Sequence, residues 1–168
     1  MSYRKFDKIY IFLFFIALLC LSCEERFKYK DNFYNKTGGS DYKRLPLIKP
    51  FEMWSTGNIP NYWYYQLKSH NIKFTSQIAG SEVSVSDAFI IIHYKGGYQQ
   101  VKSLADPEKF YLVDTKRKLE YEFNRLQELT TFLSNNQFDS NKISFYNLDS
   151  IYTQFNQTGR LPWVSDNH

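Results

Sequence analysis

The sequence predicts an α+β fold: an antiparallel sheet of about five to six strands, one long amphipathic helix packed on a face of it, and a short C-terminal helix. Three observations predict it. A continuous apolar run at 88–94 is typical of a strand covered on both faces. Apolar residues between 119 and 133 recur at a helical spacing. The segment 147–159 carries helix start and stop signals.

The first 22 residues have the order of a removable export signal. This leader holds three basic residues, an apolar run and a small residue before a cysteine: Arg4, Lys5 and Lys8, then 9–19, then Ser22 and Cys23. The apolar run is shorter than the roughly 20 residues that a membrane-spanning helix needs, and charged residues flank it. We therefore expect residues 1–22 to be cleaved.

The motif Leu21-Ser22-Cys23 resembles the signal of bacterial lipoproteins, and the acidic pair that follows Cys23 resembles the Bacteroidota type. The resemblance covers residues 1–25. It implies that Cys23 carries acyl chains such as palmitate, and that the protein is anchored in the cell envelope. The expected place is the outer membrane, on its periplasmic or outer surface. Cys20 stands where this class usually has Leu, so ordinary cleavage or an uncleaved anchor remain alternatives.

The composition of the mature chain excludes several classes of function. No cysteine follows Cys23, so neither an internal disulfide nor a site with several thiolates can form, and we expect no metal or cofactor. Residues 1–22 hold three basic residues and one acid, which leaves 18 basic and 16 acidic residues and a net charge of +2. Such a balance gives no electrostatic footprint for nucleic acid. The length fits a single domain, which we place at 44–168.

Residues 23–43 are expected to form a flexible tether, because they lack a sustained period and contain Gly38-Gly39-Ser40. Their four aromatic residues are more than a free linker needs: Phe27, Tyr29, Phe33 and Tyr34. The alternative is that this segment docks on the domain or rests at the lipid headgroups.

The strand signals follow in chain order. Pro46 and Pro50 each remove a ladder donor, so the extended segment 45–54 is expected at a sheet edge. The segments 62–67 and 72–78 are predicted hairpin partners, and 82–85 is a short strand. The remaining expected elements are the central strand 88–94, a two-glycine turn at 95–98, a returning segment at 99–103 and a strand at 110–113.

Two helices are predicted after these strands. The long one has an apolar stripe with spacings of four, three, four and three residues: Leu119, Phe123, Leu126, Thr130 and Leu133. Asp114 or Thr115 is its expected cap, and 134–136 ends it. The short helix starts at its cap Asn147 and ends at Gly159, which can adopt the left-handed conformation.

No specific catalytic motif is present: the sequence has no nucleophile elbow, phosphate loop, dinucleotide turn or His-Glu-x-x-His pair. His93 could act as a general base, but a strand-end histidine with a hydrogen-bonded ring is the favoured interpretation. The carboxylate pairs Asp106/Glu108 and Glu120/Glu122 are interpreted as solvated surface. The second pair would point to different faces of the predicted helix. We therefore expect a non-catalytic protein.

One row of aromatic residues gives a positive functional indication: Tyr62, Trp63, Tyr64 and Tyr65. Alternate members of a strand face opposite ways, so one pair could be displayed as a platform for a protein or for the face of a sugar. An ordinary packed sheet face is the other interpretation. The expected function is a binding module for an envelope or secreted protein, such as a toxin-neutralising immunity lipoprotein. A carbohydrate-binding or glycan-processing accessory is the alternative, and the sequence does not indicate an oligomeric state.

Overall fold

The computed structural model describes residues 26–56, 63–67, 78–86, 88–96 and 107–165. They form a mixed α+β fold with antiparallel sheets, as predicted. The elements are η1 (Asn32–Asn35), β1 (Lys43–Pro46), β2 (Phe51–Ser55), β3 (Trp63–Leu67), β4 (Ile78–Gly80), β5 (Glu82–Val85), β6 (Phe89–Tyr94), β7 (Lys109–Asp114), β8 (Leu119–Phe123), α2 (Leu126–Asn135), η2 (Ser140–Lys142), β9 (Tyr146–Asn147) and α3 (Leu148–Thr158).

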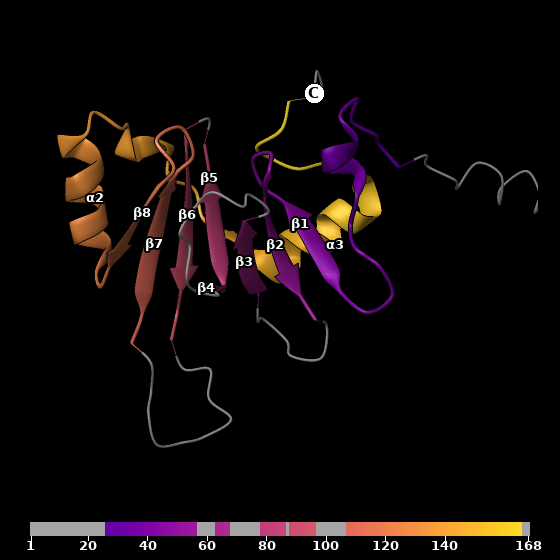
Figure 1. Ribbon diagram of the computed structural model, residues 1–168, viewed down its shortest axis with the longest axis horizontal. Coiled ribbons are helices and arrows are strands. Elements are labelled where there is room, and N and C mark those ends of the chain that lie inside the picture. The colour runs from indigo at the N-terminus through magenta and orange to yellow at the C-terminus, as the bar shows by residue number, and fades with distance from the viewer. Residues whose placement is uncertain (1–25, 57–62, 68–77, 87, 97–106, 166–168) are drawn as a thin grey trace, which may run out of the picture.

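The strands form two antiparallel sheets, ordered β1-β2-β3-β4 and β8-β7-β6-β5-β9. β4 leads into β5 through Ser81, whose backbone N–H donates to the carbonyl of His93 at 2.9 Å. The two sheets therefore lie side by side as one row of strands (Figure 1). The nine strands in the described ranges exceed the five to six that the sequence predicts.

β6 is the central strand with both faces covered, as predicted. Ile90 and Ile92 belong to the core that contains the buried residues of α3. Phe89 and Ile91, on the opposite face, belong to a second core with Leu129 and Leu133 of α2. This two-sided burial follows from the strand period, because consecutive side chains point to opposite faces of the sheet. α3 thus packs in one core and α2 in the other.

α3 has the predicted start and end. The side chain of its N-cap Asn147 accepts a hydrogen bond from the backbone N–H of Ser150 at 3.0 Å. Gly159 follows the last turn with φ of 77°, and its N–H donates to the carbonyl of Phe155 at 2.8 Å. Leu148, Ile151 and Phe155 form the buried face of α3. The short C-terminal helix is confirmed.

The predicted long helix is wrong in its first part. Residues 119–123 form β8, which pairs antiparallel with β7, and the helix covers only Leu126–Asn135. Asp114 does accept backbone hydrogen bonds from Lys116 and Arg117, at 3.0 and 2.8 Å, as a helix cap would. The chain then reverses through Lys118, at φ of 58°, into a hairpin. Pairing with β7 therefore prevails over helical spacing at these residues.

The segment 45–54 is also not one extended edge segment. It forms the hairpin β1–β2 around a cis Lys49–Pro50 bond. β1, with Pro46 at its end, is the edge strand as expected, whereas β2 pairs on both sides. β3 pairs with β4 at Ile78–Gly80, which shares only Ile78 with the predicted partner segment 72–78. The predicted segments 72–77 and 99–103 lie outside the described residues.

The prediction of a flexible tether at 23–43 is wrong for residues 26–43, and the docking alternative holds there. Tyr29 and Tyr34 are buried in the α3-side core, and Phe27 and Phe33 are partly buried against it. Arg44 fastens this segment from β1, because its Nη1 donates to the carbonyls of Phe33 and Lys36 at 2.9 and 2.7 Å. The folded body therefore includes residues 26–43.

Candidate functional site

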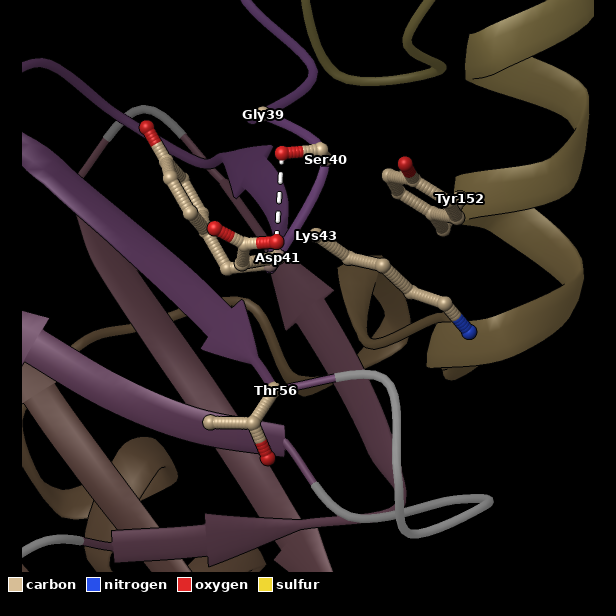
Figure 2. A pocket seen from close by; sticks show the side chains of 7 residues that line it. Gly39, Ser40, Asp41, Lys43, Thr56 and Tyr152 are labelled. Atoms are coloured by element: carbon tan, nitrogen blue, oxygen red, sulfur yellow. Dashed lines mark hydrogen bonds between the residues drawn. The ribbon is translucent and has the colours of Figure 1, made fainter.

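A polar cleft of about 450 Å³ opens between the loop before β1, the end of β2 and α3. It is lined by Gly39, Ser40, Asp41, Tyr42, Lys43, Thr56 and Tyr152. Figure 2 shows Tyr152 facing the loop from α3, while the Lys43 side chain extends from β1 toward that helix. Tertiary folding thus brings segments from both ends of the chain to one site.

Backbone hydrogen bonds hold the loop before β1, which forms one side of the cleft. Gly38 has φ of 113° and forms an isolated antiparallel bridge with Lys43. The N–H of Gly39 donates to the carbonyl of Tyr42 at 3.1 Å. A Cβ atom at Gly38 would lie only 2.3 Å from the carbonyl oxygen of Tyr42, so glycine is required there. The hydroxyls and carboxylate of the loop therefore have a defined backbone position.

Lys43 connects the loop side of the cleft to α3. Its Nζ lies 3.7 Å from Oδ1 of Asp149 and 5.5 Å from the ring centroid of Tyr152. The same Asp149 oxygen accepts a hydrogen bond from Nε1 of Trp63 at 3.1 Å. The Lys43 side chain remains 37% exposed, so its amine is accessible to a ligand in the cleft.

Aromatic rings stiffen two sides of the cleft. Tyr42 stacks on Trp54 with ring centroids 4.5 Å apart, and Nε1 of Trp54 donates to Oε1 of Glu52 at 2.8 Å. Burial raises the pKa of the Tyr152 phenol, against the opposing charge of Arg26. Tyr152 is therefore a neutral hydroxyl donor and acceptor at neutral pH.

The lining supplies hydrogen-bonding groups and charges of both signs. Ser40, Thr56 and Tyr152 offer hydroxyls, Asp41 a carboxylate and Lys43 an amine. No histidine or cysteine is among the lining residues. Across the described ranges, no group of three or more His, Cys, Asp or Glu side chains could hold a metal ion. The cleft has the chemistry to bind a polar chain.

No family model, curated protein or solved structure matches this chain. In the part of the chain that the structure describes, no helix is both long and apolar enough to cross a membrane. The leader and Cys23 lie outside the described residues, so the lipid anchor stays a prediction.

Trp63 is not a displayed member of the aromatic row, so it is excluded as a candidate binding residue. Its side chain is fully buried, and its ring packs against Tyr152 with centroids 5.4 Å apart. Tyr62 lies outside the described residues, and so do the side chains of Tyr64 and Tyr65. Trp63 belongs to the α3-side core, because its side chain points to the face of β3 that α3 covers.

Sequence reasoning missed the cleft. Gly38-Gly39-Ser40 indicated a linker, although the same residues are also typical of a tight turn before a strand. Tyr152 belonged to the helix pattern with no functional role, and Lys43 closed the predicted tether. The available signal was the turn chemistry just before β1. Nothing in the sequence indicated that α3 would lie opposite it.

His93 has the hydrogen-bonded ring that the sequence interpretation favoured. Its Nδ1 lies 2.9 Å from Oε2 of Glu82, its Nε2 lies 2.7 Å from Oε1 of Glu108, and its ring stacks on Phe110. Burial alone would raise the pKa of Glu82, but hydrogen bonds from Lys95 and His93 hold it below its usual value. Both ring nitrogens are thus occupied by carboxylates, which indicates a structural role.

The carboxylates Glu120 and Glu122 lie on the same face of the sheet, which corrects the helical argument that separated them. On a strand, residues two apart share a face. Glu122 forms an ion pair with Lys109 and its side chain is 49% exposed. Glu120 is partly buried, and its Oε1 has no hydrogen-bond partner among the described residues. Neither residue lines the cleft.

Replacing Glu120 by glutamine is expected to stabilise the protein above neutral pH. Burial raises the pKa of Glu120 from 4.5 to about 7, so the folded state holds its proton where the unfolded state has lost it. Stability of the natural protein should therefore fall as the pH rises from 4.5 to about 7. The gain from Glu120→Gln should be near zero at low pH and about 1 kcal/mol above neutrality, after discounting for solvent screening.

Urea denaturation of both proteins across this pH range measures that difference. Glu122→Gln is the matched control on the same strand, because it removes an exposed carboxylate that is already paired. A pH-independent gain at position 120 would contradict a raised pKa at Glu120.

Proposed function

We propose that this chain is a non-catalytic binding module, anchored in a bacterial envelope by acylation of Cys23, which captures a segment of an envelope or secreted protein in its polar cleft. The leader pattern supports the anchor. Immunity lipoproteins that neutralise a toxin are one class of small, lipid-anchored proteins that bind another protein.

The cleft is the observation that carries the binding proposal. Its hydroxyls, its accessible Lys43 amine and its Asp41 carboxylate suit the mixed donors, acceptors and charges of a polypeptide segment. Such a site needs no nucleophile or general base. The loop that carries Ser40 and Asp41 is fixed by hydrogen bonds before a partner arrives, which lowers the entropy cost of binding.

A glycan ligand is the alternative, and the geometry of the rings favours it less. Sugar recognition uses an accessible aromatic face. One face of Tyr42 is stacked on Trp54, and the Lys43 amine lies over the ring of Tyr152. Trp63 offers no face to a ligand because it is buried.

Photocrosslinking in cells tests the proposal. Benzoylphenylalanine at Ser40 or Thr56, on two sides of the cleft, is expected to give an adduct with one discrete protein. The same group at Lys116, an exposed residue of the β7–β8 turn, is the matched control and should give none. Equal adducts at all three positions would contradict a site in the cleft. Adducts that resist protease and disappear with glycosidase would favour the glycan alternative.

A further inference from the structure

We infer that the folded body lies directly against an anionic bilayer surface, with residues 26–30 and the last turn of α3 toward the lipid and α2 away from it. This inference rests on the proposed acylation of Cys23 and adds an orientation to it. It replaces the expectation of a long-reach tether with a close, oriented contact.

Hydrogen bonds fix residues 26–29 on the C-terminal end of α3. The N–H of Phe27 donates to the carbonyl of Thr158 at 2.9 Å, and Nη2 of Arg26 donates to the carbonyl of Phe155 at 3.3 Å. The N–H of Leu161 donates to the hydroxyl of Tyr29 at 2.6 Å. Since Tyr29 is only 3% exposed, this docking is part of the core.

Gly159 allows this close approach. A Cβ atom at that position would lie 2.0 Å from the carbonyl oxygen of Phe27, and its φ is 77°. Only glycine fits both conditions without strain. The terminator of α3 is thus also the surface on which the N-terminal segment rests.

The covalent reach from the anchor to this docked segment is short. Three residue steps separate Cys23 from Arg26, and a chain spans at most about 3.6 Å per residue. The Cα atoms of these two residues are therefore no more than about 11 Å apart. The twenty steps to Lys43 in the expected tether would have allowed about 70 Å.

The anchored end and α2 lie at opposite ends of the molecule. Figure 1 shows η1 and the C-terminal end of α3 at one end of the long axis, and α2 at the other. A lipid attached within about 11 Å of Arg26 therefore holds this end at the bilayer and leaves α2 at the end farthest from the attachment point.

The charge of the anchored end matches an anionic surface. Lys28, Lys30 and Arg160 are exposed there, and Arg26 lies over the ring of Phe155. The nearby carboxylate of Asp31 is paired with Lys49 at 2.8 Å. Glu24 and Glu25, directly after Cys23, are negatively charged. The excess of basic residues is therefore on the folded body and not in the segment that joins it to the anchor. Basic residues this close to lipid headgroups are attracted to them.

Fluorescence quenching on vesicles tests the orientation. Cys20 and Cys23 are the only cysteines, so an introduced cysteine can be labelled alone once Cys23 is acylated and Cys20 removed. Gln157→Cys places a label on the last turn of α3, and Asn135→Cys places one on α2; both positions are exposed. The lipidated full protein is reconstituted in vesicles of phosphatidylethanolamine and phosphatidylglycerol that carry a nitroxide on some headgroups.

We expect several-fold stronger quenching at position 157 than at 135. A ~20-residue Gly/Ser insertion between Glu25 and Arg26 is the matched control and should remove most of that difference. Equal quenching of the two labels in the protein without the insertion would overturn the orientation while leaving the anchor in place. Intact mass is measured first on the same sample, and a mass without acyl chains on Cys23 would overturn the proposed anchor and this inference together.

Discussion

Replacing Arg44 by methionine is expected to lower the free energy of unfolding by about 3 to 5 kcal/mol, because it leaves the Glu52 carboxylate buried without its guanidinium partner. The two side chains are joined at 2.5 Å between Nε and Oε2, and both residues are at most 5% exposed. Methionine keeps much of the apolar volume of the arginine stem, so the loss reports the ion pair together with the guanidinium's hydrogen bonds to the carbonyls of Phe33 and Lys36. Urea denaturation followed by circular dichroism measures it.

A double variant serves as the control for this prediction. Arg44→Met with Glu52→Gln removes both charges and keeps an oxygen that can accept from Nε1 of Trp54. It should recover the part of the loss that comes from the unpaired Glu52 charge, since a neutral side chain avoids the cost of a buried charge. Similar stability of the single and double variants would contradict the assigned role of the ion pair.

The same substitution should loosen the N-terminal segment. Arg44 also donates to the carbonyls of Phe33 and Lys36, and its guanidinium lies 4.6 Å from the ring centroid of Phe33. Trypsin should therefore cut more rapidly after the exposed Lys28 and Lys30 in Arg44→Met. The core of α3 and β6 should stay protected.

Replacing Trp63 by alanine is expected to cost about 3 to 5 kcal/mol of stability, the usual loss for a buried aromatic side chain. Trp63 has no exposed surface, and its indole N–H donates to Asp149. If Trp63 belonged to the displayed pair of the aromatic row, the replacement would instead reduce partner binding at unchanged stability. Chemical denaturation followed by circular dichroism separates the two outcomes without depending on tryptophan fluorescence.

Trp63→Phe is the matched variant. It keeps most of the apolar contact and removes only the hydrogen bond to the Asp149 carboxylate, so the expected loss is about 1.5 to 3 kcal/mol. Loss of partner capture in Trp63→Phe, at unchanged stability, would return this position to the binding surface.

The error at residues 119–123 shows where sequence patterns are ambiguous. Leu119, Tyr121 and Phe123 alternate with Glu120 and Glu122, so the segment has a strand period as well as a helical one. Asp114 carried a correct signal, since it does accept backbone hydrogen bonds, but a turn and a helix cap use the same chemistry. Residues 119–123 form a strand and not a helix because the edge of β7 supplies ladder hydrogen bonds to β8.

The aromatic residues of 26–36 pack in the core, and this role became visible only in the fold. Tyr29 and Tyr34 have no helical or strand period, so the sequence indicated a linker. Their burial depends on a surface made by the nearby β1 and by α3, which lies far away in the chain. Leu161, which bonds Tyr29, is 132 residues distant.

Local sequence patterns were sufficient to predict α3 with its caps Asn147 and Gly159, and the strand β6 with both faces covered. These features depend on hydrogen bonds and apolar spacing within a few residues, which a pattern records directly. Strand pairing with β7 was needed to define β8. Contacts between distant segments were needed to define the docking of residues 26–36 and the cleft between Lys43 and Tyr152. These features are stabilised by contacts that form only after separate segments of the chain have packed together.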